Sequence, residues 1–560
     1  ISDHLPTFSI DPSLSNPRNI SRKTITTRIF NERSKDEFSG KLLNETWHEV
    51  FTCNNANEAY TSFNQTFTNI YNSCFPYTTK TINPKRNKPW LTPGIKKSIK
   101  HKNKLYVIFH KRPTVQNEIK YKSFRRILTK VIRDTERDYY HSLLLRHQKN
   151  PRLTWKTLKN IMQKHEDKQP LPQLIHDNQP VTAPTDIVDC FNQHFTEIGP
   201  KLASSIPSTP QAPESFLHGD YPQSFFFTPT TEVEVKNCIL LLKNGSPGHD
   251  DIHPQVIREN ADNIKAPLTH VINLSLTQGT IHQDLKTANI TPIFKGGSTH
   301  DVNNYRPISV LPTFSKVLER IVYNKMINYI NSNNILSKNQ FGFRKGHSCE
   351  MPLMLAVDLI TEALDQHDDV IGIFLDMRKA FDTVDPEILV RKLKHYGFRG
   401  VSGDWLEDYL THRLQIVKYC NTSSSARIVQ CGVPQGSTLG PLLFLLFIND
   451  LCNIHTAFSP FVFADDTTLF LRGNDLNTMT LTANTELTHI STWLKTNKLS
   501  INLSKTHFMH FTLHPNKRNA PLNININGQP IHSCEHTKFL GLIIDSKLNW
   551  SHHINSIANK

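Results

Sequence analysis

The stretch FVFADDTTLF, residues 461–470, places two adjacent carboxylates, Asp465 and Asp466, inside an otherwise apolar run. Like charges repel each other, and burying a carboxylate costs several kcal/mol unless a cation or hydrogen-bond donors compensate. An aspartate pair most often marks a solvated turn. Any other interpretation of this pair needs support from the rest of the sequence.

A second stretch, VIGIFLDMRKAFDTVDPEIL at residues 370–389, contains a continuous apolar run that ends on Asp376. The run predicts a buried strand, residues 370–375, that delivers Asp376 to its C-terminal edge. FVFADDTTLF predicts a β-hairpin with the acid pair at its turn. Two buried elements would then deliver three acids to one edge.

Three carboxylates that converge in an apolar frame repel strongly unless divalent cations lie between them. Mg²⁺ fits best, because it prefers hard oxygen ligands and bridges phosphates, and these two stretches contain no cysteine or histidine. Two such ions about 4 Å apart clamp the attacking and leaving oxygens in phosphoryl transfer. The three acids therefore indicate a metal-dependent phosphoryl-transfer site.

The composition is that of a protein with room for a core, with 38% apolar residues and a mean hydropathy of −0.42 over 560 residues. This length predicts two to four structural units. The longest apolar run, PLLFLLFI at residues 441–448, is too short to span a bilayer, so we expect no membrane partner. Nine scattered cysteines without zinc spacing predict reduced thiols in an intracellular protein.

The positive charge is concentrated in one segment. Residues 85–164 hold 23 lysines and arginines against four acids, more than the whole net charge of +15. Such a segment is typical of a polyanion partner. Its periodicity predicts helices on both sides of Pro113, with aromatic residues between the charges. The alternative is a solvated helix face with an aromatic core stripe. Four lysines at helical spacing are the predicted nucleic-acid contacts: Lys96, Lys97, Lys100 and Lys104.

Proline-rich stretches divide the rest of the chain. Aromatic residues at three-to-four spacing predict a helix over residues 44–77. Linkers follow at HEDKQPLPQLIHDNQPVTAPT and SSIPSTPQAPES. Beyond them, short apolar runs alternate with amphipathic segments, which indicates an α+β or α/β architecture.

Nine motifs in a fixed order resemble the reverse transcriptase of a non-LTR, LINE-type retrotransposon of the jockey group, over nearly the whole chain. They are NGSPGHDDIHPQVI, LKTANITPIFKGGS, NNYRPISVLPTFSKVLERIV, NQFGFRKGHSC, FLDMRKAFDTVD, GVPQGSTLGPLLFLLFINDL, FADD, WLKTNKLSINLSKTHFMHF and KFLGLIIDSKLNW. The resemblance implies an α+β right-hand polymerase with fingers and palm, preceded by the basic helical extension.

The resemblance also implies roles for the acids. Asp376 and Asp465 would be direct ligands of two Mg²⁺ ions, with Asp466 beside them and the backbone carbonyl of Met377 as a further ligand. Mn²⁺ would be a substitute for Mg²⁺. Lys505 matches the general acid that protonates pyrophosphate, although a structural role would also explain it.

Further motif positions would bind the nucleotide. Lys295 and Arg306 match residues that hold the triphosphate, and Phe381 matches a steric gate against the 2′-hydroxyl, with an ordinary core aromatic as the alternative. Gln435 and Gly436 would permit close approach of the nascent base pair. Ser437 is expected to cap a helix that runs to Leu451.

Both ends of the chain carry partial motifs, and the chain is expected to be a fragment. SDHLPTFSI at residues 2–10 resembles the last motif of an apurinic-type endonuclease, in which Asp3 would orient His4. KFLGLIIDSKLNW resembles a primer grip, so the thumb would be mostly missing. The expected divisions are an endonuclease remnant at 1–10, a helical linker at 11–84, the basic segment at 85–165, a linker and helix at 166–229, fingers and palm at 230–515, and the primer-grip region at 516–560.

The function implied by the resemblance is RNA-directed DNA synthesis from a nicked target primer. The partners would be template RNA, primer or target DNA and deoxynucleoside triphosphates. The protein would act in the nucleus and travel in the cytoplasm as a ribonucleoprotein, although no clear targeting signal is present. The alternative is an inactive element remnant that only binds nucleic acid.

Overall fold

The computed structural model describes residues 23–82, 88–162, 173–176, 179–420, 422–454, 457–518 and 520–559. The chain divides into two units, residues 1–30 with 75–170 and residues 31–74 with 171–560. The proposed endonuclease residues Asp3 and His4 lie outside the described residues. Within these described ranges, no helix has the length and apolar character needed to cross a membrane.

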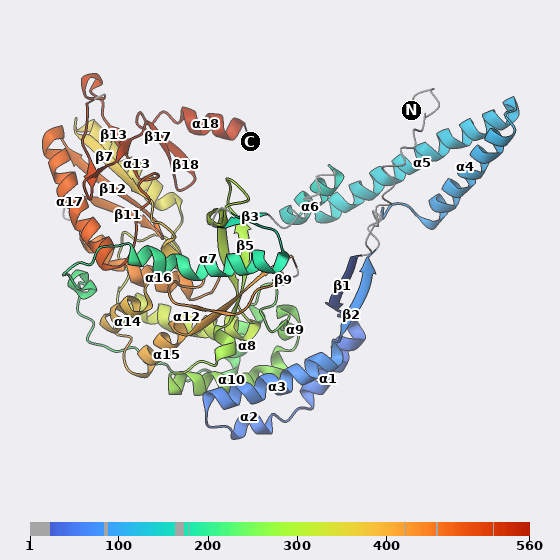
Figure 1. The fold of residues 1–560 in the computed structure, drawn as a ribbon, viewed down its shortest axis with the longest axis horizontal. Helices are drawn as coiled ribbons and strands as arrows, with labels where there is room; N and C mark the ends of the chain where they lie inside the picture. Colours follow the sequence, from blue (N-terminus) through green and yellow to red (C-terminus); the bar gives the residue numbers. More distant parts are fainter. Residues whose placement is uncertain are drawn as a thin grey trace. The chain divides into compact units, whose positions relative to one another are not determined.

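The smaller unit contains a two-stranded antiparallel sheet and three helices (Figure 1). These elements are β1 (Lys23–Arg28), β2 (Tyr77–Ile82), α4 (Pro93–Lys111), α5 (Val115–His147) and α6 (Pro151–Ile161). Thr92 caps α4 by accepting the N–H of Ile95, and Thr114 caps α5 by accepting the N–H of Asn117. The predicted interruption at Pro113 is confirmed, because proline disfavours a helical conformation in the residue before it.

The aromatic residues of the basic segment pack between α4 and α5. The ring of Tyr121 lies 5.4 Å from that of Tyr106 and 6.2 Å from that of Phe109, and His101 meets Phe124 at 5.0 Å. These rings form contacts between the two helices, although the Tyr106 side chain itself is exposed. The predicted contact lysines are exposed on α4: Lys96, Lys97, Lys100 and Lys104.

The larger unit begins with three helices, α1 (Glu32–Leu43), α2 (His48–Thr52) and α3 (Ala56–Cys74). The single helix predicted over residues 44–77 is wrong, because Asn55 accepts the N–H groups of Asn57 and Glu58 and so starts a new helix. Phe63 and Phe67 of α3 pack edge-on against Phe314, at 5.0 and 5.2 Å. Residues 31–74 thus share the core of the larger unit.

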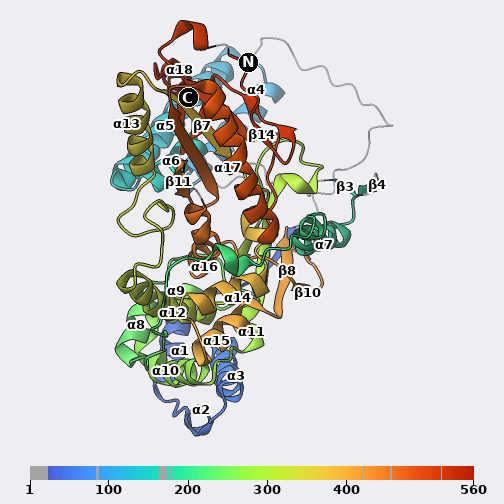
Figure 2. The same cartoon turned by 90° about the vertical axis from the view of Figure 1, so that its left-hand side faces the viewer.

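The central sheet has the strand order β11-β12-β7-β13-β16. Its strands are β7 (Asp369–Leu375), β11 (Ser459–Phe463), β12 (Asp466–Gly473), β13 (His507–Phe511) and β16 (His532–Ser533). Every residue of β7 is buried, which confirms the predicted buried strand. Figures 1 and 2 show why, since α13 (Glu350–Asp365) and α17 (Leu476–Thr496) lie on opposite sides of this sheet.

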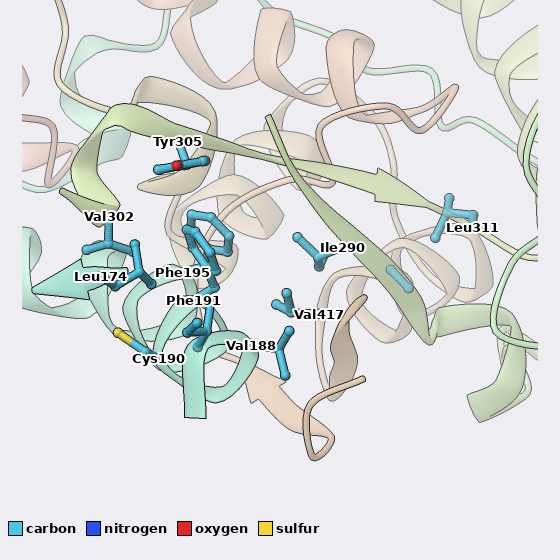
Figure 3. Close-up of a cluster of buried hydrophobic side chains, with 12 residues drawn as sticks. Leu174, Val188, Cys190, Phe191, Phe195, Ile290, Val302, Tyr305, Leu311 and Val417 are labelled. Atoms are coloured by element: carbon cyan, nitrogen blue, oxygen red, sulfur yellow. The ribbon is translucent and has the colours of Figure 1, made fainter. Parts of the chain in front are cut away.

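A second sheet has the order β10-β8-β5-β6, with β9 paired to β8. Its strands are β5 (Ala288–Phe294), β6 (Tyr305–Val310), β8 (Arg413–Tyr419), β9 (Thr422–Ser423) and β10 (Arg427–Val429). Helix α7 (Pro184–Ser204) packs on it, and Figure 3 shows its residues Val188, Phe191 and Phe195 directed at Ile290 and Val417 of the sheet. This core fixes the β5–β6 hairpin against α7.

The remaining helices and strands complete the larger unit. The helices are α8 (Glu232–Leu240), α9 (Pro254–Glu259), α10 (Ala261–Gln278), α11 (Gln283–Lys286), α12 (Thr313–Ser332), α14 (Pro386–His395), α15 (Val401–Leu410), α16 (Gly440–Ile448) and α18 (Ser551–Ala558). The strands are β3 (Leu174–His176), β4 (Gln179–Val181), β14 (Asn525–Ile526), β15 (Gln529–Pro530), β17 (His536–Phe539) and β18 (Leu542–Asp545).

A buried ion pair links α14 to the end of α16. Lys392 and Asp450 are both fully buried, and the Lys392 Nζ lies 2.7 and 2.9 Å from the two carboxylate oxygens. The Lys392 ammonium also donates to the carbonyl of Phe447, and the indole N–H of Trp493 donates to Asp450 at 3.0 Å. Burial lowers the pKa of Lys392, and the Asp450 charge opposes that shift. The buried charge of Lys392 is therefore stabilised by the charge of Asp450.

Replacing Asp450→Asn should lower the free energy of unfolding by about 3–5 kcal/mol, because the Lys392 ammonium stays buried without a counter-charge. Chemical denaturation of the full chain measures this loss. The control is Glu37→Gln, which removes the exposed Glu37–Lys41 pair of α1 and should leave the unfolding free energy almost unchanged. If the two variants had the same free energy of unfolding, the buried pair would contribute no more to stability than the exposed pair.

Candidate active site

The acid pair lies at the turn between β11 and β12, as predicted. Phe463 pairs with Asp466, so Ala464 and Asp465 form a two-residue turn and Asp466 begins β12. Ala464 has a left-handed backbone, with φ of 56°. In the neighbouring pair of strands Thr467 is opposite Leu375, so the next position along places Asp466 across from Asp376. The strand register thus brings the three acids together.

Nine of the predicted site residues line a single cleft of about 1060 Å³. They are Lys295, Arg306, Asp376, Met377, Phe381, Gln435, Asp465, Asp466 and Lys505. Gly436 follows Gln435 with φ of +113°, and a Cβ at Gly436 would lie 2.7 Å from the carbonyl oxygen of Ser309. A side chain at position 436 would therefore be both strained and obstructed.

The carboxylates repel each other in the cleft. Burial raises the pKa of Asp465, and the Asp376 charge raises it further. Asp466 is exposed at the start of β12, but partial desolvation in the cleft raises its pKa to about 6, with added repulsion from Asp465 and Asp376. The charges of Arg306 and Lys295 act in the opposite direction on both acids. The negative charge at this edge is only partly compensated by the protein.

The donor set suits a hard cation, since it consists of carboxylate and carbonyl oxygens. In the part of the chain that the structure describes, no three His, Cys, Asp or Glu side chains have already converged into a metal-binding group. A divalent cation would remove the repulsion that raises the pKa values of Asp465 and Asp466, so the residues fit such an ion.

Asp376 is held by residues that the sequence analysis did not single out. The Asn502 side-chain amide donates to Asp376 Oδ2 at 3.0 Å, and the Asn502 backbone N–H donates to the Asp376 carbonyl at 2.8 Å. The Thr506 hydroxyl accepts the Asp376 N–H at 3.3 Å, and Lys505 Nζ lies 4.0 Å from Asp376 Oδ2. The turn-forming asparagine three residues before Lys505 was the available signal in the motif INLSKT.

The opposite wall of the cleft is basic. Lys295 directly follows β5, and Arg306 lies on β6 opposite Ile293. Burial lowers the pKa of Lys295, and the charges of Arg306 and Lys505 lower it further. Lys379 also faces this wall and was missed, and its ammonium donates to the carbonyls of Asn303 and Tyr305 at 3.3 Å each. The cleft therefore sets a cationic wall against the acids.

Residues 293–544 match the family model described as "Reverse transcriptase (RNA-dependent DNA polymerase)". The chain contains a reverse transcriptase domain. The matched segment begins near the end of β5, ends within β18 and includes the nine predicted site residues that line the cleft.

The reverse transcriptase domain has relatives in mobile elements of Drosophila melanogaster. The chain is 30% identical over 354 residues to "RNA-directed DNA polymerase from mobile element jockey", covering 61% of this chain and 38% of the relative. It is 29% identical over 424 residues to "Probable RNA-directed DNA polymerase from transposon X-element", covering 72% and 45%. The protein from transposon BS is 30% identical over 352 residues, covering 59% and 38%. The chain thus spans less than half the length of these relatives.

In the reverse transcriptase domain, Phe381 lies between the cleft and helix α16. Its ring lines the cleft and also stacks on Phe444 of α16, with centroids 4.2 Å apart and planes 20° apart. The ring of Phe343 meets it edge-on at 6.1 Å. Packing against α16 restricts the orientation of the Phe381 ring at the cleft surface.

The loop before α16 is ordered by local hydrogen bonds in the reverse transcriptase domain. The Gln435 side chain donates to Asp382 at 2.6 Å, and the Gln435 carbonyl accepts the N–H of Ser309 at 2.7 Å. Ser437 Oγ accepts the N–H of Gly440, which is the first residue of α16. The helix expected to reach Leu451 ends at Ile448 and continues as a 3₁₀ segment, Asn449–Asn453, so its predicted end was wrong. Asp450, which pairs with Lys392, lies within this 3₁₀ segment.

Asp466→Asn should stabilise the metal-free protein at pH 7. The folded-state pKa of about 6 lies above the ordinary value of 3.8, so the folded state binds the proton more tightly and stability falls as pH rises between these values. Above pH 6 the asparagine removes the free-energy cost of an ionised carboxylate at position 466 in the folded state. The melting temperature should therefore rise by roughly one or two degrees. Thermal melts in chelator should show little difference at pH 4.

Asp36→Asn, an exposed position of α1, is the control for Asp466→Asn and should melt like the wild type at both pH values. A stabilisation by Asp466→Asn that is the same at pH 4 and pH 7 would show that charge repulsion is not its cause.

Proposed function

We propose that the chain is an RNA-directed DNA polymerase that copies the RNA of a non-LTR retrotransposon into DNA from a nicked target primer. The observation that carries this proposal is the single cleft that sets three acids against a cationic wall inside the reverse transcriptase domain. A growing strand needs its nucleotide triphosphate neutralised on one side and its reacting oxygens coordinated on the other. The cleft provides both surfaces.

The architecture supports a right-hand polymerase. The central sheet with Asp376, Asp465 and Asp466 would be the palm, and the β5–β6 hairpin with Lys295 and Arg306 would belong to the fingers, both within residues 230–515. Residues 516–560, which contain the β17–β18 hairpin, would form the primer-grip region. The segments before residue 230 would keep the divisions expected from the sequence.

The three acids, with the Met377 carbonyl, would hold two Mg²⁺ ions, and Mn²⁺ would substitute. Reverse transcriptases generally use divalent metal ions, which polarise the phosphoryl group and activate the primer hydroxyl. Lys295 and Arg306 would bind the triphosphate, for which the guanidinium offers a bidentate fork. Lys505 would donate a proton to the leaving pyrophosphate, from an ammonium 4.0 Å from Asp376.

The substrate side of the cleft would select deoxynucleotides. Phe381, held by its stacking on Phe444, would leave no room for a 2′-hydroxyl. Gln435 and Gly436 would let the nascent base pair approach, and the glycine also lets its loop pack closely against Ser309. Template RNA, primer DNA and deoxynucleoside triphosphates would be the partners, in the nucleus for synthesis and in a cytoplasmic ribonucleoprotein before it.

Asp376→Asn should reduce Mg²⁺-dependent primer extension on an RNA template by about a thousandfold, because several kcal/mol of metal-supplied stabilisation are lost. Template binding should stay within about twofold of the wild type, since a uniform loss would indicate misfolding. The measurements are single-nucleotide extension and filter binding. Asp358→Asn, an exposed position of α13, is the matched control and should extend normally. A wild-type chain that binds RNA but never extends a primer would favour the remnant alternative.

We also propose that the basic segment, residues 85–165, binds RNA through its phosphates. Each phosphate contact on a single strand contributes a slope of about −0.7 in log K against log salt. The exposed α4 lysines lie within roughly two and a half helical turns, so one backbone could contact them together. Replacing all four with Gln should make the slope shallower by up to ~3. The four are Lys96, Lys97, Lys100 and Lys104.

A filter-binding salt titration measures this change, and extension at saturating template should change little. The control variant replaces four exposed lysines of the larger unit and should keep the wild-type slope: Lys41, Lys201, Lys394 and Lys418. Identical slopes for the α4 variant and the wild type would show that these lysines do not contact RNA and would favour the alternative of a solvated helix face.

A further inference from the structure

The turn that carries the acid pair is held from outside the hairpin by Gln340. This side chain is 1% exposed, and its Oε1 accepts the backbone N–H of Ala464 at 3.1 Å and that of Gly342 at 2.8 Å. Ala464 is itself 3% exposed. Without Gln340 Oε1, the Ala464 N–H would lose its partner in a buried position, which costs free energy.

The backbone next to Gln340 pairs with β11. Gln340 forms a parallel bridge with Val462, the Phe341 N–H donates to the Val462 carbonyl at 2.8 Å, and the Val462 N–H donates to the Asn339 carbonyl at 2.9 Å. A Cβ on Gly342 would lie 2.4 Å from the Ala464 nitrogen. Residues 337–344, called the 337–344 loop below, thus make close contact with the turn itself.

The 337–344 loop is anchored to the core at its other end. The Arg344 guanidinium donates to the carbonyls of Ser337 and Gln340 at 2.7 and 3.0 Å. The side chain of Asn449, which follows α16, accepts the Ser337 N–H and donates to the Ile335 carbonyl, both at 2.8 Å. Hydrogen bonds therefore run from the end of α16 through the loop to the acid-bearing turn.

The hairpin needs this external support because its own turn sequence is unfavourable. Two-residue hairpin turns favour Asn-Gly or Asp-Gly, whose residues adopt positive φ at little cost. Here the turn is Ala-Asp, and the left-handed Ala464 costs on the order of 1 kcal/mol or more. Such a strained residue persists only when surrounding contacts determine its conformation. Gln340 and Gly342 supply those contacts.

We propose that Gln340 is a positioning residue that sets Asp465 and Asp466 relative to Asp376 and thereby determines the affinity of the acid cluster for divalent cations. Its effect on synthesis rests on the proposed polymerase function, whereas its effect on cation binding does not. Gly342 acts in the same role by allowing the loop to approach the turn.

The test uses the full chain and Mn²⁺ as the probe, with binding followed by electron paramagnetic resonance without nucleotide or primer. Gln340→Met keeps the length of the side chain but removes the acceptor. The Mn²⁺ dissociation constant of the acid cluster should rise about tenfold, as expected for a displaced turn with an unsatisfied N–H. Asp465→Asn removes one of the proposed ligands, so its titration shows the Mn²⁺ binding that remains when the acid cluster is disabled. In extension assays, the half-saturating Mg²⁺ concentration should rise by the same factor while template affinity stays constant.

A matched control is Gln278→Met, since Gln278 also accepts a backbone N–H, that of Ala56, away from the cleft. Gly342→Ala disturbs the same turn independently of Gln340, because the added Cβ would press on the Ala464 nitrogen. Its control is Gly40→Ala, where an added Cβ meets nothing within 4 Å. All titrations are made below the unfolding transition of every variant, so a loss of stability cannot imitate weakened binding.

Weaker Mn²⁺ binding in Gln340→Met and Gly342→Ala, with both controls unchanged, supports the proposal. Unchanged Mn²⁺ affinity in these two variants overturns it, whatever happens to their melting temperatures, and so does a wild-type titration identical to that of Asp465→Asn. A wild-type chain that binds Mn²⁺ in a Gln340-dependent way but extends no primer would retain this inference and overturn the polymerase proposal.

Discussion

The burial of β7 along its whole length is the constraint on which the cleft depends. Helices α13 and α17 cover the two sides of the central sheet, so a shift of one residue in the register would turn apolar side chains into the wrong layer. With the register fixed, the residue after Leu375 and the residue before Thr467 must face each other. Both are aspartates. The core therefore enforces a proximity that the charges themselves oppose.

This opposition explains how the rest of the cleft is built. Residues from distant parts of the chain hold each acid in place, Asn502 and Thr506 at Asp376 and Gln340 at the turn. The positive charges of Lys295 and Arg306 in the cationic wall lower the electrostatic cost of Asp465 and Asp466. The same arrangement, unfavourable for the protein alone, would favour the polyphosphate and divalent cations of the proposed function, so part of the folding stability would be exchanged for affinity.

The strand, the hairpin and nine of the residues that line the cleft could be predicted from the sequence, because apolar runs and ordered motifs are local signals. The sequence analysis did not find Gln340 or Asn502 as supports, since a hydrogen bond between segments distant in sequence leaves no periodic pattern. The aromatic stripe of α3 indicated burial but not the partner, which proved to be Phe314 of α12. The helix break at Asn55 was missed because the apolar spacing continued across a residue whose side chain competes for backbone N–H groups.

The path of the chain through its two units restricts how they can be exchanged between proteins. Strand β1 (Lys23–Arg28) precedes α1–α3 of the larger unit, and its partner β2 (Tyr77–Ile82) follows them. The smaller unit is therefore not a continuous cassette. Recombination that transferred residues 75–170 alone would leave β2 with an open edge, and open strand edges recruit other chains into aggregates. Transfer of β2 as a continuous segment together with its partner β1 therefore also carries helices α1–α3.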